Sequence, residues 1–501
     1  MPLKNWIILQ FAKSQQKAIQ KMASNAIADQ EKWFNYLIQK ARQTSFGQDH
    51  SFHTINSKQA FQKNVPIRNY ENLKDYIEAI IQGDSNVLWP GKPKYFGKTS
   101  GTTSGVKYIP ISKESIKFHI KTARNAIMNY VALTGKNVFT KKMIFLSGSP
   151  VLIEKGGVAT GRLSGIVNHE VPSWVRPNQL PSYSTNCIED WEEKLDKIVQ
   201  ETVTQDMSLI SGIPPWVQMY YERLQIETGK STIKEVFPNL QLFIHGGVNY
   251  KPYQPIIDKL HGAGVDTLET YPASEGFIAF QDSLDEDGLL LNTDAGMYFE
   301  FVRPGEINNP EPQRLGLKDV ELDEDYAVII SSNAGLWAYS IGDTIRFVSK
   351  DPYRVIVSGR IKHFISAFGE HVISKEVEEA MDIVAQKHNL TINEFTVAPQ
   401  VQPHDESLPF HEWFVEFESL PHSIQQIEKE LDYEIRRQNI YYDDLITGKV
   451  LRHLKISPLR KDAFRSYMKS LGKLGGQNKV PRLTNDRQIA DALKEYIIQN
   501  T

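Results

Sequence analysis

The stretch "LQLFIHGGVNYKPYQPIIDKLHGAGVDTLETYPASEG", residues 240–276, decides the fold class. It begins with an apolar run that ends in glycines and continues with a helical pattern over 253–264. It closes on a second apolar run that ends in small and polar residues. The same order recurs upstream, where "MIFLSGSP" (143–150) precedes a helical pattern over 191–205. Strands that alternate with helices predict an α/β fold with a parallel, doubly wound sheet. Such sheets bind ligands at the carboxyl ends of their strands, where these clusters fall.

Outside this region the pattern changes in three places. Residues 5–45 and two shorter segments after them predict helices, with Gly47 and Gly83 as stops. From about 297 onward, short strands crowd together and predict a more antiparallel, barrel-like region. After Gly359 the order helix, strand, helix predicts a small α+β unit. We therefore predict a large N-terminal domain over 1–358 and a smaller, mobile C-terminal domain over 359–501, with a hinge near 360–362.

Composition excludes several classes of protein. A chain of 501 residues suits two or more domains, and 41% hydrophobic with 23% charged residues is ordinary for a soluble protein. The net charge of -3 argues against a nucleic-acid binder. The single cysteine, Cys187, excludes a disulfide framework and fits a reducing cytoplasm. No run approaches the ~20 apolar residues that span a bilayer. We expect a soluble, cytoplasmic protein with neither nucleic acid nor membrane as a partner.

The segment "KTSGTTSGVKYIP" (98–110) is a candidate phosphate-binding loop. Its two glycines allow a tight turn, and consecutive backbone N–H groups in such a turn suit an anion. Four hydroxyl side chains and a following lysine add donors and positive charge: Ser100, Thr102, Thr103, Ser104 and Lys107. The segment has neither the P-loop nor the dinucleotide-binding spacing. Taken alone, a plain solvated turn is the commoner structure for such a sequence.

Three further segments raise the odds of a nucleotide site. In "TYPASEGF" (270–277), Tyr271 ends an apparent strand, so its ring could stack on a heterocycle, and Glu275 could bind Mg²⁺. In "WAYSIGDTIRF" (337–347), Asp343 is expected at an exposed turn between two strands, where it could bind ribose hydroxyls. In "SGRIKHF" (358–364), Arg360 and Lys362 mark the domain boundary. Each has an ordinary alternative, respectively a core tyrosine with a solvated glutamate, a hairpin turn and a basic linker.

Together and in this order, the four segments resemble the adenylate-forming superfamily of acyl-CoA synthetases, luciferases and peptide-synthetase adenylation domains. "TSGTTSGVK" is similar to its phosphate loop, "YPASE" to its adenine and magnesium motif, "YSIGD" to its ribose motif, and "GRIKHFISAFGEHVISKEVE" to its hinge. "HGGVN" (245–249) resembles the glycine-rich segment along the adenine. The ending "YMKSLGKLGGQNKVPRL" (467–483) resembles one branch, the auxin-responsive acyl-acid amido synthetases of plants and their bacterial relatives.

Two motifs depart from the wider pattern. The phosphate loop has Thr103-Ser104 where Thr-Gly is usual, and Val106 where proline is frequent. The ribose motif has Ser340 in place of an arginine, which leaves Arg346 as a candidate to compensate.

The resemblance implies a ligase that uses ATP and Mg²⁺ to adenylate a carboxylic acid and then transfers the acyl group to the amine of an amino acid. It implies that the loop hydroxyls and Lys107 hold the phosphates, that Glu275 binds the metal, and that Asp343 and Arg360 hold the ribose. The adenine would lie among Tyr271, Gly247 and Val248, with Ser274 on the α-phosphate. Lys362 would be the hinge. Lys479, with Lys449 as the second choice, would be the lysine that acts during adenylation only. His371 is a candidate for the base, with a structural histidine as the alternative.

Two other functions stay open at this point. An acyl-CoA synthetase would share the first step and use a thiol acceptor, and a catalytically silent relative would only bind the nucleotide. The identity of the acid, the acceptor and the oligomeric state are not readable from the sequence.

Overall fold

The computed structural model describes residues 3–102, 105–248, 250, 253–307, 309–361, 364–370, 372–403, 407–471 and 480–498. The chain divides into two compact units, which are treated separately below. The larger unit comprises Met1–Thr99, Lys107–Ile188 and Lys194–Ile361, and the smaller one Ser100–Val106, Glu189–Glu193 and Lys362–Thr501. In the described part of the chain, no helix is both long and apolar enough to cross a membrane.

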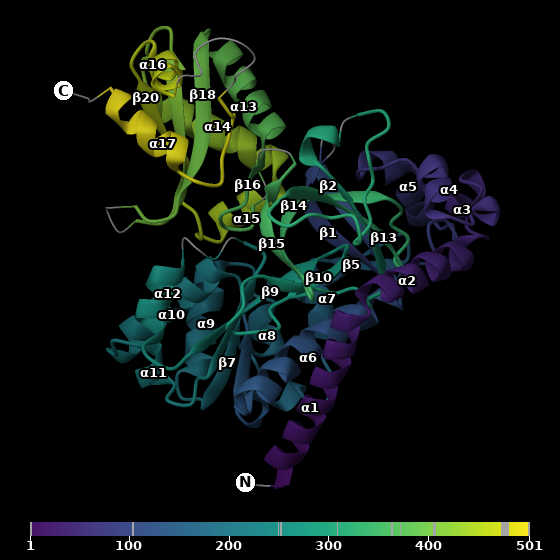
Figure 1. Ribbon diagram of the computed structural model, residues 1–501. Coiled ribbons are helices and arrows are strands. Elements are labelled where there is room, and N and C mark those ends of the chain that lie inside the picture. The colour runs from purple at the N-terminus through teal and green to yellow at the C-terminus, as the bar shows by residue number, and fades with distance from the viewer. Residues whose placement is uncertain are drawn as a thin grey trace. The chain divides into compact units, whose positions relative to one another are not determined.

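The larger unit begins with helices, as predicted (Figure 1). They are α1 (Leu3–Ser24), α2 (Ala26–Ala41), α3 (Ser45–Asp49), α4 (Lys58–Asn64) and α5 (Lys74–Gln82). The expected helix over 5–45 is interrupted near Asn25 and ends at Ala41. Gly47 is not its stop, because it lies inside α3, where a Cβ would come 2.1 Å from the Ala41 carbonyl oxygen. Gly83 does end α5, in the left-handed conformation.

An 11-stranded sheet in the described part of the larger unit carries the site. Its order is β12-β13-β14-β15-β11-β10-β9-β8-β7-β3-β6. The parallel part contains β3 (Lys142–Phe145), β6 (Gln179–Leu180), β7 (Met207–Ser211), β8 (Leu242–Gly246) and β9 (Asp266–Ala273). The antiparallel part contains β10 (Gly276–Phe280), β11 (Leu289–Leu291), β12 (Met297–Val302), β13 (Asp325–Ser332), β14 (Tyr339–Lys350) and β15 (Tyr353–Arg360). The antiparallel strands predicted after residue 297 therefore extend the same sheet through the β11–β15 pairing.

Helices cover both faces of the parallel strands, which confirms the doubly wound α/β class. Leu242 of β8 belongs to a hydrophobic cluster that includes residues of α6 (Ser115–Thr134), along which α1 packs. Its neighbour Phe243 points to the other face, since it contacts His261 of α12 (Gln254–His261), which packs against α10 (Pro214–Thr228). Successive residues of a strand point to opposite faces, so these two contacts define the two layers. Shorter helices are α7 (Leu163–Glu170), α8 (Tyr183–Asn186), α9 (Trp191–Thr202) and α11 (Ile233–Val236).

A second, four-stranded sheet has the order β2-β1-β5-β4. Its strands are β1 (Tyr95–Thr102), β2 (Gly105–Ile111), β4 (Ile153–Lys155) and β5 (Val158–Gly161). The candidate phosphate-binding segment, 98–110, was expected to be a loop, but its described residues belong to β1 and β2, and residues 103–104 lie outside the described part of the chain.

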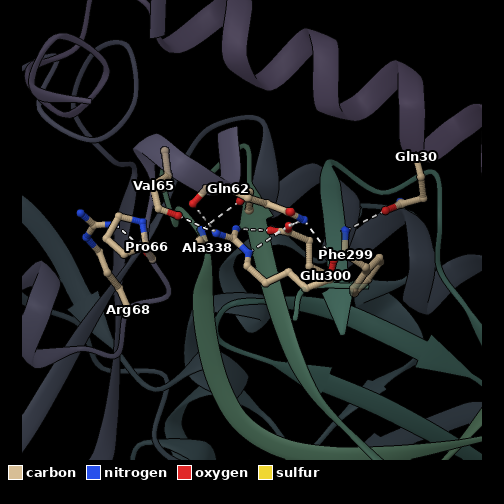
Figure 2. Close-up of polar contacts among 10 residues, drawn as sticks. Gln30, Gln62, Val65, Pro66, Arg68, Phe299, Glu300 and Ala338 are labelled. Atoms are coloured by element: carbon tan, nitrogen blue, oxygen red, sulfur yellow. Dashed lines mark hydrogen bonds and ion pairs between the residues drawn. The ribbon is translucent and has the colours of Figure 1, made fainter. Parts of the chain in front are cut away.

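Buried polar contacts fasten the N-terminal helices to the large sheet. Gln30 of α2 donates to the Met297 carbonyl at 2.9 Å and accepts from the Phe299 amide at 2.7 Å. Figure 2 shows Gln30 turned toward Phe299, and Gln62 of α4 beside Glu300 of β12. Glu300 forms a buried ion pair with Arg314, and the two side chains are 1% and 4% exposed.

The smaller unit is α+β, as predicted. Its sheet has the order β18-β19-β20, formed by β18 (Ile392–Gln400), β19 (Phe410–Phe417) and β20 (Lys455–Leu459). A short pair, β16 (Phe364–Ile365) and β17 (Val372–Ile373), precedes the helices. These are α13 (Ser374–Lys387), α14 (Ile424–Gln438), α15 (Ile440–Thr447), α16 (Ala463–Ser470) and α17 (Gln488–Leu493).

Candidate active site

Tyr271 and Asp343 meet in the larger unit although they are 72 residues apart in the sequence. The Tyr271 hydroxyl, on β9, donates to the Asp343 carboxylate, on β14, at 2.5 Å. Both side chains are buried, at 8% exposure each. The segments 270–277 and 337–347, two of the four candidate nucleotide-binding segments, therefore meet in the structure.

The prediction that Asp343 lies at an exposed turn is wrong. β14 runs unbroken from Tyr339 to Lys350, and Asp343 is a buried residue inside it. Gly342 takes a φ of 88°, which a glycine adopts without the steric cost of a Cβ. The strand continues because β15 pairs along it and sets the backbone of Arg360 opposite Asp343. Burial lowers the local dielectric and makes the carboxylate a stronger acceptor than it would be in a solvated turn.

Arg346, the candidate to compensate for the arginine that Ser340 replaces, is paired with Asp325. Its guanidinium makes two hydrogen bonds to Asp325, each of 3.0 Å, across the β13–β14 pair. These bonds hold the pKa of Asp325 below its usual value.

The turn between β9 and β10 contains Ser274 and Glu275. Gly97, on the strand that leads into the candidate phosphate loop, lies against this turn. A Cβ at Gly97 would come 3.2 Å from both Cβ and Oγ of Ser274. Gly97, which directly precedes the candidate phosphate-binding segment, therefore packs against the turn that contains Ser274. Gly97 is not among the residues predicted from the sequence, although a glycine just before the candidate phosphate-binding segment was a usable signal.

The glycine-rich segment after β8 lies against the same strand as Tyr271. A Cβ at Gly246 would come 2.2 Å from the Thr270 carbonyl oxygen, and Gly247 takes a φ of 81°. The Thr270 hydroxyl donates to the His245 carbonyl at 3.0 Å. The candidate residues therefore lie around the C-terminal end of β9: Tyr271, Ser274, Asp343 and the turn that follows His245.

For the other residues predicted to belong to the site, the structure describes the whole residue, the backbone alone, or neither. The backbones of Ser100 and Thr102 belong to β1 and that of Arg360 to β15, while their side chains lie outside the described residues. Lys107 belongs to β2 and is partly buried. Lys449, in the smaller unit, forms an ion pair with Glu192 at 2.8 Å. The predictions for five residues lie wholly outside the described residues: Thr103, Ser104, Lys362, His371 and Lys479.

The donor set fits a nucleotide and a hard divalent cation. Glu275 is half-buried and supplies a carboxylate beside Ser274. Within the described ranges, no group of three or more His, Cys, Asp or Glu side chains could hold a metal on its own. Mg²⁺ often needs only one or two carboxylates, because substrate phosphates and waters complete its shell.

Models of known protein families match three parts of this chain. The GH3 family N-terminal domain matches residues 15–183 and 158–264, the central domain matches 290–357, and the C-terminal domain matches 375–488. The jasmonoyl–L-amino acid synthetase JAR4 of Nicotiana attenuata is 22% identical, over 63% of this chain and 66% of that protein. The indole-3-acetic acid-amido synthetase GH3.15 of Arabidopsis thaliana is 21% identical, over 88% of each chain.

A solved structure shares the fold over nearly the whole length. The GH3.15 acyl acid amido synthetase superposes with a TM-score of 0.61 at 16% identity, covering 97% of this chain and 96% of that one. The three family domains lie in the expected order and together span most of the sequence. The chain therefore belongs to the GH3 family of acyl-acid amido synthetases.

Proposed function

We propose that this protein joins a small carboxylic acid to the amine of an amino acid, with ATP as the activating reagent. In the first step a carboxylate oxygen attacks the α-phosphorus, the bond to the β-phosphate breaks, and pyrophosphate leaves. In the second step the amine nitrogen attacks the acyl carbon, AMP leaves, and the amine gives up a proton. The relatives named as jasmonoyl–amino acid and indole-3-acetic acid-amido synthetases support this reaction class.

The single observation that carries the proposal for the site is the Tyr271–Asp343 contact. It joins the strand end that resembles the adenine motif to the strand that resembles the ribose motif. We assign the adenine to the face of Tyr271, with Gly247 and Val248 along it, and the ribose hydroxyls to Asp343 with the help of Arg360. The Tyr271 hydroxyl then fixes the carboxylate before the nucleotide binds, which reduces the ordering cost of binding.

The phosphates are assigned to the segment 98–110, which includes the end of β1 and the beginning of β2. Ser100, Thr102, Thr103 and Ser104 donate to them with Lys107 nearby, and Ser274 contacts the α-phosphate. Glu275 would bind Mg²⁺, which neutralises charge on the phosphates when present. These groups place the acid in line with the leaving pyrophosphate, and such positioning supplies much of the rate enhancement in phosphoryl-group chemistry.

The second step is assigned to a rearrangement at the boundary between 1–358 and 359–501, with Lys362 as the hinge. Lys479 is our choice for the lysine that acts only in adenylation. Lys449 is less favoured, because its ammonium is already paired with Glu192. His371 stays a candidate for the base, and a cytoplasmic location stays a prediction.

Pyrophosphate exchange into ATP, measured with a panel of aromatic, indolic and aliphatic acids, tests the first step. Mass spectrometry of mixtures with amino acids or coenzyme A tests the second. We expect exchange with at least one acid and an amide product. Exchange that yields a thioester but no amide would favour the acyl-CoA synthetase, and no exchange across the panel would favour the silent binder.

Tyr271→Phe tests the site itself. The ring remains, and the hydroxyl that donates to Asp343 is lost. A hydrogen bond to a charged group contributes about 1.5–3 kcal/mol, so we expect the ATP dissociation constant to rise by roughly tenfold or more. Tyr326→Phe is the matched control, because Tyr326 is a buried tyrosine of the same sheet whose hydroxyl accepts from the Glu321 amide at 3.0 Å. Equal effects of the two variants would contradict the assignment.

A further inference from the structure

His245, the penultimate residue of β8, is buried, and one of its two ring nitrogens has no hydrogen-bond partner among the described residues. Its side chain is 4% exposed, and no described residue gives its buried Nδ1 a hydrogen bond. Burial, and secondarily the nearby His261, lowers its pKa to about 3, so the imidazole is neutral at ordinary pH. A buried polar atom without a partner costs free energy, so some other contact must offset it.

That contact is the ring of Tyr250. The two rings stack with centroids 3.9 Å apart and an interplanar angle of 25°. The Tyr250 hydroxyl is also buried and has no hydrogen bond within the described chain. Phe243 packs against both rings, at 5.3 Å from His245 and 6.1 Å from Tyr250. Ring packing, rather than polar pairing, is what joins His245 to Tyr250.

The stack closes the base of the glycine-rich turn. The chain leaves β8 after Gly246, continues with Gly247 and Val248, and contacts β8 again where Tyr250 stacks on His245. Gly246 approaches the Thr270 carbonyl too closely to admit a side chain, so one wall of the turn is fixed against β9. At the other end, the Tyr250 carbonyl accepts from the amides of Tyr253 and Gln254 at 2.9 and 3.0 Å, and the stack on His245 joins the Tyr250 ring to β8. The next residue of β9 is Tyr271, which bonds Asp343.

We infer that His245 and Tyr250 are positioning residues for the nucleotide: their stacked rings clamp both ends of the Gly246–Val248 turn and hold it beside Tyr271. This inference rests on the proposed function, which places the purine along that turn. The clamp acts through the turn and touches no reacting atom. Its loss weakens binding of the nucleotide and leaves the acid and the chemical step unaffected.

Titration calorimetry of ATP in excess Mg²⁺, without acid, tests the clamp directly. An aromatic pair contributes enough for its loss to weaken binding by about two- to twelvefold. We expect a rise of this size in the dissociation constant for Tyr250→Ala and for His245→Ala. His245→Phe and Tyr250→Phe keep the rings and should stay within about twofold of the wild type, since neither polar atom has a partner to lose among the described residues. In turnover, only the KM for ATP should change, with the KM for acid and kcat constant.

His50→Ala is the matched control. His50 stacks on Phe46 with a 4.0 Å separation and an angle of 15°, in the N-terminal helices of the same unit. The His50→Ala variant should bind ATP with the affinity of the wild type. If His245→Ala fails to fold, the half-buried Tyr250 carries the test. Wild-type affinity in Tyr250→Ala would overturn the inference, as would a loss in His245→Phe equal to that in His245→Ala. Absence of ATP binding by the wild type would instead overturn the proposed function.

Discussion

Replacing Glu300 with glutamine removes the negative half of the ion pair that fastens the N-terminal helices to the sheet. The Arg314 guanidinium is 4% exposed and donates to Glu300 twice, and it donates to the Val65 carbonyl at 2.6 Å. In the variant it stays buried without its counter-charge. Breaking one side of a buried pair costs about 3–5 kcal/mol, a large share of the roughly 5–15 kcal/mol that typically stabilises a folded domain.

Urea unfolding followed by tryptophan fluorescence measures this cost, because Trp33 and Trp337 lie in the hydrophobic cluster around the pair. The control is Arg303→Ala, which breaks the pair with Glu321 in the same unit. That pair is 3.3 Å long with side chains 40% and 65% exposed, and exposed pairs contribute about 0–1 kcal/mol.

The double variant Glu300→Leu with Arg314→Leu removes both charges and should lose less than the sum of the two single changes. A Glu300→Gln variant as stable as Arg303→Ala would refute the reasoning. Strictly additive single changes would refute it as well.

Two further outcomes follow from local geometry. Gly97→Ala brings a Cβ to 3.2 Å from Ser274, so Ser274 must shift, and we expect the KM for ATP to rise by roughly tenfold. Gly305→Ala meets no atom within 4 Å and should leave steady-state kinetics as they are, and equal kinetics in both variants would contradict this account. Burial raises the pKa of Glu376 from 4.5 to about 7, so the folded state takes up a proton between these values and the free energy of unfolding falls as pH rises through that window. Glu376→Gln should remove roughly 3 kcal/mol of this decline, at ~1.36 kcal/mol per pKa unit. Urea titrations of the wild type and the variant at pH 5 and pH 8 measure the free energy of unfolding. A variant whose free energy of unfolding falls as much as that of the wild type would contradict this account.

Much of the fold could be predicted from the sequence because its signals are local. The run from Leu240 to Gly276 contains a strand, a helix and a strand within one short segment, so periodicity alone indicates a parallel unit. The order of the four motifs likewise needs no structure, and it led to the family that the domain matches show.

The sequence by itself determined the α/β class, the family and the chemical types of side chain available to the site. Only the tertiary structure decided where those side chains lie. Asp343 was expected in an exposed turn, because a glycine before an aspartate favours a turn locally, but β14 continues through this position in pairing with β15, and Asp343 is buried. The stack of Tyr250 on His245 and the approach of Gly97 to Ser274 left no periodic signal either. The approach of Gly97 to Ser274 depends on how distant strands pack together, and the stack depends on the path of the chain between two residues five apart, so a period of 2 or 3.6 residues indicates neither.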